Sequence, residues 1–89
     1  MLRPMPPERK TKPLSADHAA LGQAVQTIMA DKRLTLDDVS TGGLSIKQVG
    51  EITRGQSNPT YLNMLKLAAG LNTTLGQLMT RVDEARKWL

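Results

Sequence analysis

The chain has 89 residues, and its 12 lysines and arginines outnumber 8 acidic residues, which gives a net charge of +4 at pH 7. This length fits one small domain, and the lack of Phe and Cys means an aliphatic core without disulfides or thiolate metal sites. A modest basic excess suits nucleic acid or another anionic surface, whereas no apolar run approaches the roughly 18 residues that a membrane span needs.

Most of the net positive charge comes from the first 13 residues, MLRPMPPERKTKP, which include four prolines. Their cations are Arg3, Arg9, Lys10 and Lys12, against Glu8 alone. Because this stretch has no hydrophobic period, we expect residues 1–13 to form a flexible, disordered basic arm and residues 14–89 to form the folded domain. An inert tail remains an alternative to a functional arm.

The first helix is expected to begin after Ser15, whose hydroxyl is a good N-cap. Leu21, Val25 and Ile28 follow at helical spacing, which places one apolar stripe on the core. His18 falls in the first turn of this helix, where we expect it to be solvated.

A second, short helix with the sequence LDDVS is expected after Thr35. An acidic pair such as Asp37 and Asp38 is compatible with catalysis or a metal. Their place in a first turn instead favours helix capping, because the helix dipole stabilises negative charge there. Gly42 and Gly43 are expected to end this helix.

A third helix is predicted from about residue 46 to residue 54. Ser45 and Gln48 have the spacing of a capping box, and Val49 and Ile52 are predicted to face the core. Gly55 is expected to terminate the helix. Gly50, in the middle of it, predicts a close approach of either the second helix or a DNA backbone, and packing against the second helix is favoured.

The fourth helix, YLNMLKLAAG, is expected to start after Thr60 and to stop near Asn72 in a left-handed conformation. Its inner face is predicted to be formed by Leu62, Leu65 and Ala69.

A fifth helix is expected to open with a capping box of Thr74 and Gln77 and to extend to Leu89. Five helices joined by short links leave no room for a strand. The sequence therefore predicts a compact all-α fold.

The second and third helices are joined by a very short link that contains glycine, so they must cross at a steep angle. This is the arrangement of a helix-turn-helix, here at about residues 35–54, in which the second of the two helices enters the major groove of DNA.

Residues 21–79 resemble the phage-repressor and Cro type of helix-turn-helix protein, also called the Xre family. The resemblance rests on an ordered set of short motifs: LG at 21–22, LTLDDVS at 34–40, GLS at 43–45, RG at 54–55, NPT at 58–60, MLKLA at 64–68 and LNTTLGQLM at 71–79. It implies a lambda-repressor-like domain that binds double-stranded DNA as a sequence-specific transcriptional regulator. Repression is favoured over activation, and the location implied is the cytoplasm of a bacterium, with a bacterial or phage gene. Leu36 departs from the pattern, since the family usually has a phosphate-binding Gln there.

The resemblance places base-reading residues on the third helix: Ser45, Ile46, Lys47, Gln48 and Glu51. Their chemistry fits, because Lys binds guanine O6 and N7, Gln pairs with adenine, Glu accepts from cytosine N4, and Ile packs on a thymine methyl group. A solvated helix face would have the same composition.

The resemblance also implies contacts to the DNA backbone, for which the candidates are Thr35, Arg54, Gln56, Ser57, Asn58 and Tyr61. Two alternatives stay open at this stage. Asn58 is also suited to shaping the turn before Pro59, and the ring of Tyr61 is also suited to burial. The basic arm (Arg3, Arg9, Lys10 and Lys12) is expected along the backbone or in the minor groove.

The end of the predicted fifth helix is the candidate interface of a homodimer, through Val82, Ala85, Trp88 and Leu89. The alternative for Trp88 and Leu89 is that they fold back on the first helix. An alternative function is that of an antitoxin or co-regulator that acts mainly through a protein partner. With one His, no Cys and no polar cluster at catalytic spacing, an enzyme is not expected, and neither is a cofactor, a metal or a membrane partner.

Overall fold

The computed structural model describes residues 12–89, and over these residues the chain is built of five α-helices without a strand. They are α1 (Ala16–Lys32), α2 (Leu36–Ser40), α3 (Ile46–Thr53), α4 (Tyr61–Gly70) and α5 (Leu75–Arg86). The predicted all-α fold with five helices is thereby confirmed.

Each helix begins at a Ser or Thr whose side-chain oxygen accepts a hydrogen bond from a backbone N–H three residues on. The capping box predicted at Ser45 and Gln48 is present. At the start of α5 only half of the predicted box forms, because the Gln77 amide oxygen accepts from the Thr73 hydroxyl at 2.7 Å.

Helices α1, α3 and α4 each end within two residues of a residue with positive φ. Asn72 has a φ of 57°, as expected for the stop after α4, and Gly55 has a φ of 73° just after α3. The fifth helix is shorter than predicted, since it ends at Arg86 with Lys87 as its C-cap and does not reach Leu89.

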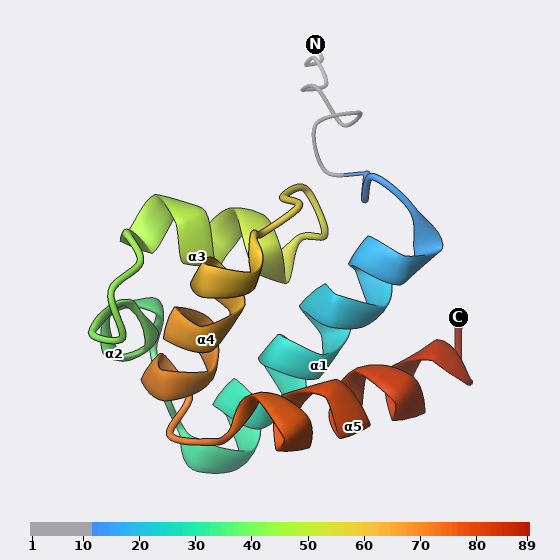
Figure 1. Cartoon of the computed structure of the whole chain (residues 1–89). Helices are drawn as coiled ribbons and strands as arrows, with labels where there is room; N and C mark the ends of the chain where they lie inside the picture. The colour runs from blue at the N-terminus through green and yellow to red at the C-terminus, as the bar shows by residue number, and fades with distance from the viewer. Residues whose placement is uncertain (1–11) are drawn as a thin grey trace, which may run out of the picture.

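The core lies where α1 crosses α5. The buried side of α3 packs against α1, and the buried side of α4 packs against α5 (Figure 1). It is aliphatic, as the composition requires, and the largest fully buried side chains are those of Ile52, Leu67, Leu71, Leu78, Val25, Val39 and Val49. The predicted stripe of α1 is buried, and so are the two residues of α3 that were predicted to face inward.

The predicted inner face of α4 is wrong. Leu62 is 58% exposed, Leu65 is 37% exposed and Ala69 is also exposed, whereas Leu67 and Ala68 are buried. The helix is rotated because Gly70 presses against the backbone carbonyl of Val39 in α2, closer than any Cβ atom would allow. This close approach leaves an outward apolar surface, Leu62, Leu65 and Ala69, which we call the α4 stripe.

Candidate nucleic-acid interface

Helix α3 lies at the edge of the molecule, with one side in the core and the other in water (Figure 1). Val49 and Ile52 are 0% and 2% exposed, so they hold the helix against α1 and α2. Ile46, at 47% exposure, and Lys47 lie in the first turn on the free side. Helix α3 is therefore fixed on its buried side, while its capped first turn is exposed. We call α3 presented in this way the rod.

The five predicted base-reading residues are together on this rod, but they are not equally free. Ser45, Ile46, Lys47 and Gln48 are exposed, and Glu51 is partly buried. The backbone N–H of Ser45 donates to the Gln48 amide oxygen at 2.9 Å, while the Ser45 hydroxyl oxygen accepts from the Gln48 N–H at 3.0 Å. A two-bond contact of Gln48 with adenine would therefore require opening this capping box.

Within the described part of the chain, the charged groups of Lys47 and Glu51 are not held in an ion pair. The two ion pairs within residues 12–89 join Asp31 to Arg81 and Asp17 to Arg86, so neither involves α3.

Arg54, the C-cap of α3, folds back along its own helix. Its Nε donates to the Gln56 amide oxygen at 3.2 Å, and its Nη1 lies 3.2 Å from where a Cβ on Gly50 would sit. The predicted packing of Gly50 against the second helix is therefore wrong, because the guanidinium group occupies that space. Arg54 remains exposed, so its positive charge lies next to the C-terminal end of α3.

The loop after α3 is tied to the beginning of α1. The N–H of Leu14 donates to the Gly55 carbonyl at 2.8 Å, and the Gln56 amide reaches the Lys12 carbonyl at 3.5 Å. These contacts place Lys12 next to the segment predicted to lie on the DNA backbone. The other arm residues, Arg3, Arg9 and Lys10, lie outside the described residues.

The sequence indicated that His18 is solvated, but in the structure its side chain has contacts within the protein. It is partly buried, and its Nε2 lies 3.2 Å from Oδ1 of Asn58, which is forty residues further along the chain. Asn58 is thus tied to α1, and its neighbour Ser57 is partly buried. Nothing in the sequence pairs His18 with Asn58, since the contact depends on how α1 crosses the loop.

The two remaining backbone candidates differ in how much of their side chain is available. The hydroxyl oxygen of Thr35 accepts from the Asp38 N–H, and the Thr35 N–H donates to the Asp38 carboxylate, which completes a capping box. Asp38 is thereby accounted for as a capping residue. Tyr61 is 70% exposed, so of the two alternatives for its ring, burial is excluded.

Leu36, at the position where the family usually has Gln, is partly buried and packs against the core. It therefore serves packing at this position.

The predicted dimer residues fall into two groups. Val82 and Ala85 are 6% and 8% exposed because they pack within the core of the chain itself, so their side chains offer no surface to a second copy. Trp88 and Leu89, beyond the end of α5, are 86% and 61% exposed. The amphipathic pattern of α5 indicated all four residues as interface residues, but the inner two pack against α1.

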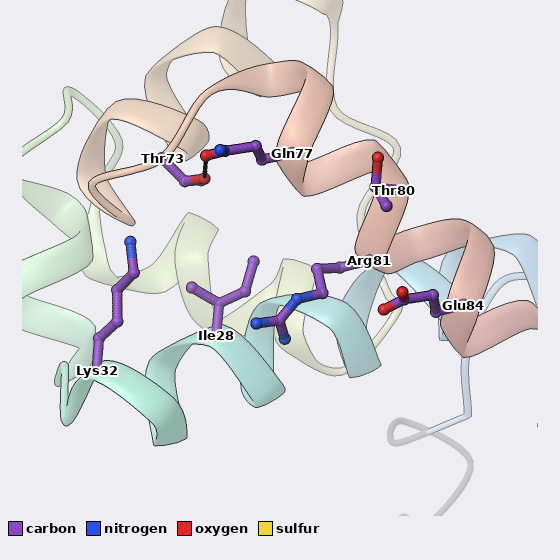
Figure 2. A pocket seen from close by; sticks show the side chains of 7 residues that line it. All are labelled: Ile28, Lys32, Thr73, Gln77, Thr80, Arg81 and Glu84. Atoms are coloured by element: carbon purple, nitrogen blue, oxygen red, sulfur yellow. Dashed lines mark hydrogen bonds between the residues drawn. The ribbon is translucent and has the colours of Figure 1, made fainter.

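A depression of about 350 Å³ separates α1 from α5 on another side of the molecule (Figure 2). Both of its cationic side chains are engaged. Lys32 Nζ donates to the carbonyls of Leu71 and Asn72 at 2.9 and 2.7 Å, and Arg81 is paired with Asp31. The hydrogen bonds of Lys32 therefore join α1 to the link between α4 and α5, which is a structural role.

Over residues 12–89, no group of three or more His, Asp or Glu residues is placed to hold a metal ion. In the same part of the chain, no helix combines the length and the apolar character needed to cross a bilayer.

The chain matches no protein-family model and no curated protein, but it is similar to solved structures. One is the restriction-modification controller protein C.AhdI from Aeromonas hydrophila, with 32% identity and a TM-score of 0.67 over 72% of this chain and 98% of that one. Two structures of the clp gene regulator ClgR from Corynebacterium glutamicum share the fold. They have TM-scores of 0.69 and 0.74 and identities of 20% and 19%, over 78% and 85% of this chain and 91% and 82% of theirs.

Proposed function

Because the chain belongs to the phage-repressor and Cro-type (Xre) family of helix-turn-helix proteins, we propose that it represses transcription by placing α3 in the major groove of a specific DNA site. The chain is a DNA-binding transcriptional regulator. The base-reading residues, the direction of regulation and the oligomeric state described below are parts of the proposal.

One observation carries the proposal: the first turn of α3 is exposed, capped and held from behind by buried Val49 and Ile52. The major groove of B-DNA is about 12 Å wide and accepts one helix. A rod fixed on its inner side enters such a groove without reorganisation.

The proposed base-reading side chains of α3 have distinct partners. Lys47 donates to guanine O6 and N7, Glu51 accepts from cytosine N4, and Ile46 packs on a thymine methyl group. Gln48 keeps Ser45 capped through its oxygen and has its amide N–H groups left for adenine N7 or a phosphate.

The DNA backbone is contacted by residues that follow α3 in the chain. Arg54 supplies a positive charge at the C-terminal end of α3, and Gln56, Ser57, Asn58 and Tyr61 supply hydrogen bonds. The basic arm, whose Lys12 is anchored beside this loop, is proposed to neutralise further phosphates.

Repression follows from occlusion of a promoter, which needs no surface other than the DNA interface. This role requires no chemical step, cofactor or metal, and it places the protein in the cytoplasm, where bacterial DNA is found.

The regulator is proposed to act as a homodimer, because one α3 covers few base pairs and paired half-sites about 34 Å apart give a longer site. Of the predicted interface residues, Trp88 and Leu89 remain in the proposal. The α4 stripe adds three apolar side chains on successive turns of one helix, with Met79 on α5 also 40% exposed. We propose the α4 stripe as the principal interface.

A second function, as an antitoxin or co-regulator that acts mainly through a protein partner, is favoured by one observation. If the dimer forms through the α4 stripe without Trp88 and Leu89, these two exposed residues leave an apolar surface for another protein.

Selection of bound duplexes from random DNA tests the proposed function. We expect enrichment of a two-fold symmetric sequence whose binding survives competition by unselected DNA at moderate salt. Retention of all duplexes alike, lost as salt rises, would contradict sequence-specific regulation and support the partner role.

A further inference from the structure

Three residues spaced four apart on α1 contact the end of α3 and the loop that follows it. Gly22 lets the carbonyls of Ile52 and Thr53 approach to 2.9 and 2.5 Å of where its Cβ would be, and Gln26 Nε2 donates to the Thr53 carbonyl at 2.6 Å. His18 stands one turn before Gly22 and reaches Asn58. One face of α1 therefore positions both the rod and the loop.

The contacts of the His18 ring bear on which of its nitrogens carries a proton. The Ser15 hydroxyl oxygen accepts from the His18 backbone N–H at 3.2 Å and lies 2.6 Å from Nδ1 of the same residue. Nε2 lies 3.2 Å from Oδ1 of Asn58, and this oxygen is an acceptor, so Nε2 is the donor. An imidazole with a proton on Nε2 satisfies the contact with Asn58, whether the Ser15 hydroxyl donates to Nδ1 or accepts from it.

This contact matters because an asparagine amide has two unlike ends. A phosphate oxygen accepts hydrogen bonds only, so it is attracted by the Nδ2 amide group and repelled by Oδ1. A free Asn side chain can present either end. With Oδ1 held by His18, the Nδ2 group of exposed Asn58 is left to face solvent, and no hydrogen bond within residues 12–89 occupies it.

We propose that His18 is a positioning residue for DNA binding, which holds the oxygen of Asn58 inward and thereby presents its amide donor to a DNA phosphate. The inference rests on the proposed function, because it assigns the role of one residue behind the same interface. His18 itself does not touch DNA in this proposal.

A matched pair of variants separates this role from a general effect on the fold. His18→Gln keeps an N–H donor at the same number of bonds from the backbone, whereas His18→Leu keeps bulk and removes the donor. Affinity is measured for a duplex that the unaltered chain has selected from random DNA. We expect His18→Leu to bind roughly three- to tenfold more weakly, as for one lost hydrogen bond, and His18→Gln to remain within about twofold of the unaltered chain.

Repeating the pair in an Asn58→Ala background completes a double-mutant cycle. The effect of His18→Leu should disappear there, because the amide that it orients is absent. An equal loss in both backgrounds, or equal binding by the Gln and Leu variants, would overturn the proposal. Thermal unfolding of each variant shows whether it is folded at the temperature of the binding assay.

Nitrogen NMR of the free chain supplies a readout that does not depend on DNA or on a variant. We expect the His18 proton on Nε2, and a proton on Nδ1 alone would overturn the proposal. If no duplex is enriched, the proposed function fails as well. If a duplex is enriched without coupling between His18 and Asn58, only the present inference fails.

Discussion

Helices α3 and α4 follow each other in the chain and have similar buried sides, but they present opposite chemistry to water. Both begin at a Ser or Thr cap, and both bury aliphatic side chains in the same core. The exposed side of α3 carries Lys47 and Gln48, whereas the exposed side of α4 carries Leu62 and Leu65. A polar exposed face suits the edges of base pairs, and an apolar one suits a second protein surface. The two faces therefore suit different kinds of partner.

The glycines of the two helices differ in the same way. Gly70 in α4 abuts the backbone of Val39, which cannot move without moving α2. Gly50 in α3 abuts the end of the Arg54 side chain, which is flexible. The position of α4 is therefore set by backbone contact, and that of α3 is set by its buried side chains.

The largest expected effect tests this contrast through stability. Gly70→Ala should lower the free energy of unfolding by about 3 kcal/mol or more, because the added Cβ overlaps the Val39 carbonyl. Gly76→Ala is the control, since only one atom lies within 4 Å there, and it should raise stability by about 0.5–1 kcal/mol. Urea denaturation measures both, and equal effects would show that the close approach is not tight in solution.

A charge placed on the apolar face should separate the two copies. Leu65→Glu is expected to weaken dimerisation roughly a hundredfold, or about 2.7 kcal/mol, because the carboxylate would be buried unpaired. Sedimentation over a range of concentrations measures this, with Trp88→Ser as the matched variant at the other exposed apolar site. Dissociation by Trp88→Ser alone would move the interface to the end of the chain. A monomer at every concentration would exclude the dimer.

On the polar face, base contacts and backbone contacts should separate. Lys47→Ala and Glu51→Ala are each expected to relax the preference at one base pair by about 1–3 kcal/mol. Arg54→Ala should instead weaken binding to all duplexes alike, because it removes a phosphate contact. Selected and single-base-altered duplexes distinguish the two patterns, and the same pattern for all three variants would contradict the assigned roles.

Removal of residues 1–12 should act on salt dependence more than on specificity. The slope of log affinity against log salt concentration is expected to fall by about 0.9 for each phosphate contact that is lost. Titrations at several salt concentrations measure the slope for the shortened and the intact chain. An unchanged slope would mean that the arm does not engage DNA.

The smallest effect is expected at the glycine of α3. Gly50→Ala should change stability by less than about 0.5 kcal/mol, since the gain in helix propensity offsets displacement of the Arg54 side chain. A loss as large as that of Gly70→Ala would show that Gly50 also packs on backbone.

The helix starts, the helix-turn-helix and the exposed residues of α3 could be predicted because each depends on neighbours within a few residues. A Ser or Thr cap acts on an N–H three positions away, and in α3 the two buried residues stand among polar ones, so its inner side is unambiguous. The sequence of α4, YLNMLKLAAG, has apolar residues on nearly every side. Its periodicity alone therefore gave the wrong inner face.

The sequence by itself determined where the helices begin, that they are helices, and which of them has a polar outer side, because these properties arise from local hydrogen bonds and side-chain spacing. Only the tertiary structure decided that Val82 and Ala85 face α1, that the α4 stripe faces water, and that His18 reaches Asn58. These contacts join segments far apart in the chain. They depend on the crossing of α1 with its neighbours and on the backbone approach at Gly70, which no local pattern encodes.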